Sequence, residues 1–156
     1  MVTLNQRPRV LNPRLAAILA ELRHGEMLFV ADAGSGSHAK ALRPLDPGVE
    51  QINLEVVTGV PSLDDLVPVI CDNADIEACI VTEDMRSANP DGFAMLVGLF
   101  GEDRVHEMKY MPDYYDMRDR CKAFVQTGDY RVHANVILIG GYPSADIPID
   151  MIINGI

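Results

Sequence analysis

Apolar positions along the chain change their period several times, which predicts helices that alternate with strands. From Leu15 to Leu22, leucine and isoleucine recur at helical spacing, with Asn12-Pro13 before them and Gly25 after them. Asparagine followed by proline favours a helix start and glycine favours a helix end, so we expect a helix between them. Met27–Ala31 is a continuous apolar run of strand length, typical of a strand that is buried on both faces of a sheet.

The alternation continues to the end of the chain. Strands are expected at Ile52–Val57, Ile76–Val81, Arg104–Tyr110 and Val136–Ile139, and helices at Leu63–Cys71, Pro90–Phe100 and Asp113–Thr127. Pro68 should bend or shorten the first of these helices, and the tail Tyr142–Ile156 predicts no clear element. The pattern predicts an α/β fold: a single three-layer domain over residues 1–156, with a mostly parallel sheet of about five or six strands and flanking helices.

Composition narrows the classes of partner. The chain has 156 residues, which fits one domain. Its net charge is −10, whereas nucleic acid and anionic membrane surfaces call for a basic face, so neither is expected as a partner. No apolar stretch approaches the ~20 residues that cross a bilayer.

Cysteine usage and the first residues bear on the compartment. The three cysteines, Cys71, Cys79 and Cys121, are an odd number and are widely spaced, which argues against a disulfide framework. Segment Met1–Arg9 is polar and lacks the apolar core of a signal peptide. We therefore expect a cytoplasmic protein.

Candidate chemistry lies at the ends of the predicted strands, where open α/β sheets bind ligands. Asp32 follows the first strand, and His133 and Asn135 lead into the last one. His24 stands at a helix-to-strand junction with Glu26 two residues on, and histidine gives and takes protons near neutral pH. The simpler alternatives are that Asp32 caps its loop and that His24 completes a helix end.

Other kinds of site are disfavoured. The loop Gly34-Ser35-Gly36 lacks the third glycine and the following helix of a dinucleotide fingerprint, and no phosphate-binding Gly-Lys-Ser/Thr is present. The histidines form no close pair, so no metal is expected. No G-x-S-x-G elbow offers a nucleophilic serine, and acid–base chemistry remains.

Three blocks of sequence resemble the ribose pyranase and fucose mutarotase family. They are Leu22–Glu26 with Asp32-Ala33 after the apolar run, Gly59–Ser62 before a helix, and Gln126–Gly128 followed by His133–Leu138. The resemblance implies a compact α/β fold and a ring-shaped homo-oligomer, commonly a decamer, with sites near contacts between subunits. It implies a cofactor-independent isomerase that interconverts ring forms or anomers of a free monosaccharide.

The resemblance also implies roles by position. His24 matches the catalytic histidine, read as the proton donor, and Asp32 matches the aspartate that holds sugar hydroxyls. Asn135 matches the second member of a sugar-binding Tyr-x-Asn motif, in which His133 replaces tyrosine. Glu26 stands where the family has aspartate and is taken as a further substrate-binding group.

One further difference from the family pattern leaves a second function open. The family places a cationic sugar-binding residue upstream of the last helix, and an ungapped count puts Met111 there. With Met111 and His133 at two sugar-binding positions, the chain is either an isomerase or a non-catalytic sugar-binding or regulatory module that uses the same cleft. The identity of the sugar is not indicated.

Overall fold

The computed structural model describes residues 8–156, so most of the segment Met1–Arg9 lies outside the described part of the chain. In chain order the elements are α1 (Pro13–Glu21), β1 (Met27–Ala31), β2 (Glu50–Asn53), α2 (Leu63–Asn73), β3 (Ile76–Thr82), α3 (Met85–Ala88), α4 (Pro90–Phe100), η2 (Glu102–Arg104), β4 (Val105–Met108), η3 (Tyr110–Tyr114), α5 (Tyr115–Arg118), β5 (Ala123–Gln126), β6 (Val136–Gly140) and α6 (Ile149–Asn154). Asn12 Oδ1 accepts a hydrogen bond from the Leu15 N–H at 3.0 Å, and Asn89 caps α4 in the same way. Both Asn-Pro pairs therefore mark helix starts, as expected.

Six strands form one sheet in the order β2-β5-β1-β6-β3-β4. Strand β6 is antiparallel to both of its neighbours, β1 and β3, and the other pairs are parallel. The remaining five strands therefore end at one edge of the sheet, where β6 begins. The predicted α/β fold with a mostly parallel sheet of five or six strands is confirmed.

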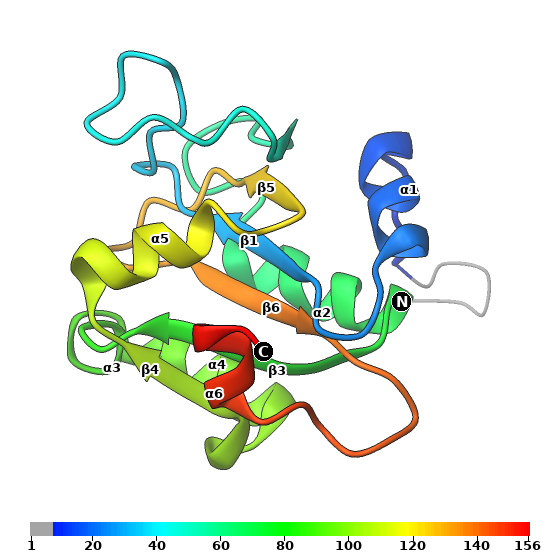
Figure 1. Cartoon of the computed structure of the whole chain (residues 1–156). Helices are drawn as coiled ribbons and strands as arrows, with labels where there is room; N and C mark the ends of the chain where they lie inside the picture. The colour runs from blue at the N-terminus through cyan, green and yellow to red at the C-terminus, as the bar shows by residue number, and fades with distance from the viewer. Residues whose placement is uncertain (1–7) are drawn as a thin grey trace.

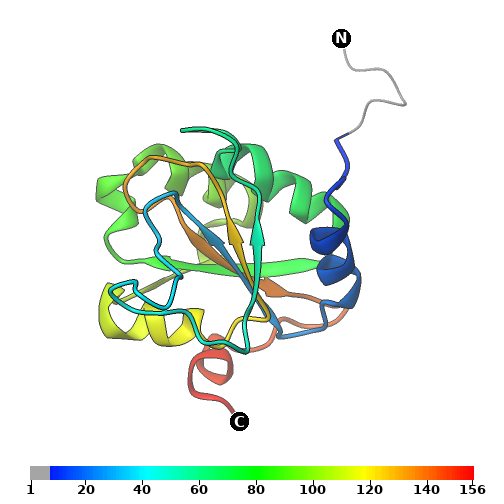
Figure 2. The same ribbon diagram turned by 90° about the horizontal axis from the view of Figure 1, so that it is seen from above.

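Helices cover both faces of this sheet (Figures 1 and 2). One core lies beneath α1, α2 and α4 and receives Leu28 and Val30 from β1. The other lies beneath α5 and α6 and receives Met27 and Phe29 from the same strand. Successive side chains of a strand point to opposite faces, so β1 needs apolar residues at every position. The sheet and the helices on its two faces therefore form the three layers.

The predicted helix Asp113–Thr127 is wrong. The chain forms the irregular turn η3 and the short helix α5, and then enters the sheet as β5 between β2 and β1. Tyr114, Met117 and Cys121 have helical spacing, and all three are buried against one face of the sheet. A short apolar run such as Ala123–Val125 fits a buried helix or a strand equally well by period alone. Pairing with a parallel strand on each side decides for the strand.

Three smaller differences concern element ends. Strand β2 covers Glu50–Asn53 instead of Ile52–Val57. Pro68 does not shorten α2, which continues to Asn73. The carbonyl that proline leaves unpaired belongs to Asp64, on the exposed first turn, where water is available. The tail forms α6, whose Ile152 is buried in the chain's own core.

Candidate active site

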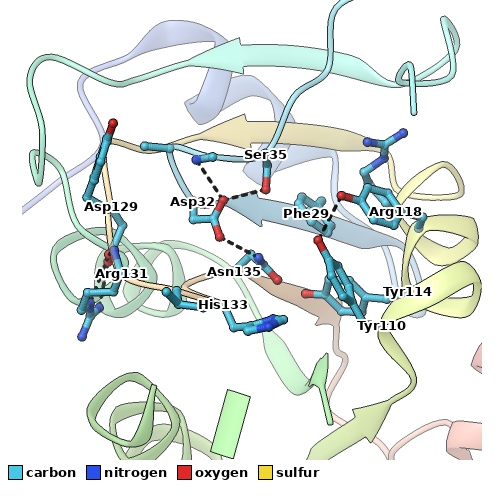
Figure 3. A pocket seen from close by; sticks show the side chains of 15 residues that line it. Phe29, Asp32, Ser35, Tyr110, Tyr114, Arg118, Asp129, Arg131, His133 and Asn135 are labelled. Carbon is cyan, nitrogen blue, oxygen red and sulfur yellow. Dashed lines mark hydrogen bonds and ion pairs between the residues drawn. The ribbon is translucent and has the colours of Figure 1, made fainter. Parts of the chain in front are cut away.

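A cavity of about 380 Å³ opens at the edge where the parallel strands end (Figure 3). Asp32 enters it from the end of β1 and Asn135 from the loop before β6. Although these residues are 103 positions apart, Asn135 Nδ2 donates a hydrogen bond to Asp32 Oδ2 at 3.0 Å. The antiparallel insertion of β6 brings them together, because its start lies at the edge where β1 ends.

Asp32 also organises the loop that follows it. Its Oδ1 accepts hydrogen bonds from Ser35 Oγ at 2.8 Å and from the Gly34 N–H at 3.1 Å. Asp32 therefore caps its loop with one carboxylate oxygen and faces Asn135 with the other, so the capping reading holds and its role toward a sugar stays a prediction. The Gly34 amide is engaged within the loop, and no helix follows the glycines before β2.

The amide oxygen of Asn135, like the Tyr114 hydroxyl, is a buried polar atom at the cavity that lacks a hydrogen-bond partner among residues 8–156. Asn135 is only 6% exposed. Leaving such a buried acceptor unpaired costs about 1–3 kcal/mol. In Figure 3 the Asn135 side chain projects into the cavity beside Asp32. A ligand hydroxyl bound there would satisfy this oxygen.

His133 forms a further side of the cavity. Its backbone has a positive φ of 53°, and its Nδ1 lies 3.0 Å from Thr82 Oγ1. Its ring meets Tyr110 edge-on, with 5.1 Å between centroids. One ring nitrogen is thereby engaged by Thr82, and Nε2 remains for a ligand. Strand β3 thus supports the site although it contributes no lining residue.

Aromatic and cationic side chains from η3 and α5 complete the cavity. Tyr110 and Tyr115 share a hydrogen bond of 3.3 Å between hydroxyls, which together with burial raises the pKa of Tyr110 to about 12. The Arg118 guanidinium is buried, lies 4.9 Å from the Tyr115 ring centroid and donates to the carbonyls of Gly36, Arg43 and Pro44. Flat aromatic faces combined with fixed polar groups suit a small polyhydroxylated ligand.

The sequence analysis missed Tyr110 because it placed this residue at the end of a strand, and it missed Arg118 because it placed one long helix over Asp113–Thr127. The ungapped count pointed to Met111, which does not line the cavity, whereas Arg118 does. The pairing of Tyr114-Tyr115 with an arginine one turn later was the available signal. This signal indicates a cavity wall only when the helix is known to end at Arg118.

The other two predicted residues, His24 and Glu26, lie at the opposite edge of the sheet. They precede β1, whereas Asp32 follows it, and this strand of five residues spans roughly 16 Å. His24 Nε2 lies 2.6 Å from Glu77 Oε1. Glu26 accepts hydrogen bonds from Lys122 Nζ at 3.1 Å and from the Arg23 N–H at 2.6 Å. Within one chain, His24 and Glu26 do not line the cavity.

The cysteines have the properties of structural residues. All three thiols are free, and burial raises the pKa of each, to about 11 for Cys71. They remain protonated at neutral pH and are poor nucleophiles. In the described part of the chain, no three His, Cys, Asp or Glu residues are grouped as metal ligands. The expectation that the chain binds no metal or other cofactor stays a prediction.

The model of the RbsD / FucU transport protein family matches residues 5–143. The chain belongs to this family. The resemblance drawn from the three sequence blocks is thereby confirmed. Although the family is described as one of transport proteins, none of the helices within residues 8–156 is long and apolar enough to span a membrane.

Relatives in the RbsD / FucU family include D-ribose pyranases. The protein of that name from Thermoanaerobacter sp. (strain X514) is 29% identical over 135 residues, which cover 85% of this chain and 94% of the relative. The D-ribose pyranase of Bacillus subtilis (strain 168) is also 29% identical, over 132 residues and with the same coverage.

Solved structures share the fold of this RbsD / FucU member. Bacillus subtilis RbsD complexed with D-ribose superimposes with a TM-score of 0.76 at 28% identity, covering 88% of this chain and 98% of that one. The fucose mutarotase of Streptococcus pneumoniae in complex with L-fucose gives a TM-score of 0.68 at 19% identity, covering 85% and 94%. The second likeness concerns the fold alone.

Proposed function

We propose that this chain is a cofactor-independent isomerase that interconverts ring forms or anomers of a free monosaccharide. The observation that carries the proposal is the cavity pair of Asp32 and Asn135, with its buried and unpaired amide oxygen. A sugar offers adjacent hydroxyls, each of which donates one hydrogen bond and accepts others. An aldose of ribose or fucose type is the substrate class, and the D-ribose pyranase relatives favour a ribose-like sugar.

The reaction needs only proton transfer. A base removes the proton of the anomeric hydroxyl, the bond between the anomeric carbon and the ring oxygen breaks, and an acid protonates the ring oxygen. The resulting open aldehyde recloses through another hydroxyl to change ring size, or after rotation of the carbonyl to change the anomer. His24 is the proton donor, Asp32 and Asn135 hold hydroxyls, and His133 Nε2 contributes a further hydrogen bond.

This assignment requires two copies of the chain at each site. His24 and the cavity lie at opposite edges of one sheet, so His24 of a neighbouring copy serves the sugar in this cavity, and Glu26 arrives beside it. Contact between two different edges is head-to-tail, and head-to-tail contacts form a ring when the rotation between successive copies closes. We therefore infer a ring-shaped homo-oligomer, with the decamer of the family resemblance as the expected size.

Exposed apolar side chains at the mouth of the cavity support this contact. Tyr130 and Val132 line the cavity and are strongly exposed, and Val56 and Val57 are exposed in the adjoining hollow beside Tyr130. At the opposite edge, Tyr142 is exposed next to His24. Contiguous exposed apolar surface marks interaction sites.

The free thiols further support the cytoplasmic location that we propose.

Magnetisation exchange between sugar ring forms tests the function directly. Ribose, fucose and several other aldoses are followed by NMR with and without the protein. For one sugar class we expect exchange to accelerate by ~10²–10⁴-fold, the usual contribution of positioned acid–base groups. Sugar binding without acceleration of any aldose, from the assembled protein, would instead establish the sugar-binding module.

A further inference from the structure

A buried carboxylate lies next to His24. Glu77 is the second residue of β3, its side chain is 6% exposed, and its Oε1 lies 2.6 Å from His24 Nε2. An ionised carboxylate accepts hydrogen bonds and donates none. Nε2 therefore carries a proton and donates it to Glu77, which leaves Nδ1 as the ring nitrogen that exchanges a proton with a ligand.

The Glu77 side chain is held in place from several directions. Its second oxygen, Oε2, accepts a hydrogen bond from the Ile147 N–H at 2.8 Å. The register of β3 against β6 shifts between Ile76 and Ala78, so Glu77 lies at an irregularity in the ladder. Such bulges re-aim side chains and are common next to active sites. Gly141 packs so closely that a Cβ there would lie 3.0 Å from Glu77 Cβ.

His24 is also fixed by its backbone and its neighbours. Gly25 adopts a φ of +85°, and its N–H donates to the Gly140 carbonyl at 2.8 Å, which ties this turn to the end of β6. The Tyr142 ring stacks on the imidazole, with 6.2 Å between centroids and 27° between planes. The His24 side chain remains 26% exposed, so the imidazole is held but is still reachable.

We propose that Glu77 is the positioning residue of His24. It keeps a proton on Nε2 and fixes the plane of the ring, so that the imidazolium gives its Nδ1 proton to the sugar ring oxygen and the neutral ring later recovers a proton at the same nitrogen. The proton of the anomeric hydroxyl passes to a base in the cavity or to water, so one proton leaves the sugar for each proton that His24 supplies. The inference rests on the proposed function for the identity of the reaction. Glu26, which follows His24 in the sequence, is engaged by Lys122 instead.

The substitution Glu77→Gln tests this role because it keeps the shape of the side chain. The amide oxygen stays at the Ile147 N–H, so the NH₂ group faces Nε2, which must then accept. The proton of a neutral ring moves to Nδ1, and the imidazolium loses its carboxylate. We expect kcat for ring exchange to fall by at least about tenfold, which is part of the ~10²–10⁴-fold that positioned acid–base groups supply. KM should change little, because Glu77 does not touch the sugar.

A spectroscopic readout separates this role from a purely structural one. With ¹⁵N-labelled histidine, the His24 ring signals should show a protonated Nε2 in the wild type and the opposite tautomer in Glu77→Gln. Glu102→Gln, at an exposed carboxylate that pairs with Arg86 and not with His24, is the matched control. Glu77→Asp keeps the charge but cannot span both partners, and it should give an intermediate kcat. If Glu77→Gln does not assemble, a fall in kcat at constant KM in Glu77→Asp makes the same test.

Two outcomes overturn the inference. One is a Glu77→Gln protein with wild-type kcat, and the other is a His24 tautomer that does not respond to the substitution. Failure of the proposed function is recognised separately, since the wild type would then accelerate no sugar. The tautomer measurement remains decisive in that case, because it reports the pairing of Glu77 with His24 without any substrate.

Discussion

Replacement of His24 by alanine is expected to reduce kcat for sugar ring exchange by ~10²–10⁴-fold, while the protein still binds sugar. The imidazole supplies the proton, whereas Asp32 and Asn135, which hold the hydroxyls, lie at the other edge of the sheet and are not disturbed. Magnetisation exchange measures the rate, and saturation transfer from protein to sugar measures binding. His38→Ala, at an exposed position outside the proposed site, serves as the matched histidine control.

Assemblies that mix two variants test whether His24 and Asn135 of different copies serve the same sugar. An Asn135→Ala protein retains His24 but loses the amide that the sugar needs, so it should be impaired at low sugar concentration. When His24→Ala and Asn135→Ala proteins are unfolded together and reassembled at equal amounts, about a quarter of the head-to-tail contacts pair an intact His24 with an intact Asn135. At low sugar concentration, the activity of the mixture should therefore exceed that of either protein alone.

Two results would contradict a site that is shared by two copies of the chain. If both proteins assemble, as sedimentation would show, and mixing restores no activity, then His24 of one copy and Asn135 of its neighbour do not serve the same sugar. A monomeric wild type with full activity would contradict the two-copy site directly, because His24 and the cavity of one chain are separated by the length of β1.

The largest expected effect on stability comes from Asp129→Ala. Asp129 is buried and accepts hydrogen bonds from the Leu63 N–H at the start of α2 and from the Arg131 N–H and guanidinium, at 2.8 to 3.1 Å. We expect the free energy of unfolding to fall by about 3 kcal/mol, the lower end for breaking a buried pair. The lower end applies because the Arg131 side chain is 36% exposed to water. Urea denaturation measures the change.

Asp64→Ala is the matched control for this experiment. Asp64 pairs with the same arginine at 2.7 Å, but its side chain is 47% exposed, so its loss should cost at most about 1 kcal/mol. Equal losses for the two variants would contradict the importance of burial.

The Asp129 contribution should depend on pH. Burial alone raises the pKa of Asp129, but the hydrogen bonds from Arg131 and Leu63 outweigh it and hold the pKa below its ordinary value. A depressed folded-state pKa means stability that is present above the unfolded pKa and is lost as pH falls through the folded value. The difference between wild type and Asp129→Ala should therefore stay constant near neutral pH and shrink below about pH 4.

Local chemistry explains which elements the sequence predicted well. Asn12 and Asn89 identified helix starts because capping is an interaction over three residues. Met27–Ala31 identified a strand covered on both faces because both cores need side chains from it. The segment after Tyr110 was misread because Ala123–Val125 takes its conformation from β1 and β2, which are distant in the chain.

The sequence by itself determined the family, the α/β layers and the identity of several candidate residues, since these depend on residue type, order and period. Only the tertiary structure decided which of them meet. The antiparallel course of β6 joins Asn135 to Asp32, the early end of α5 brings Arg118 to the cavity, and β1 separates both from His24. These relations depend on contacts between strands far apart in sequence, which the period of any one segment does not encode.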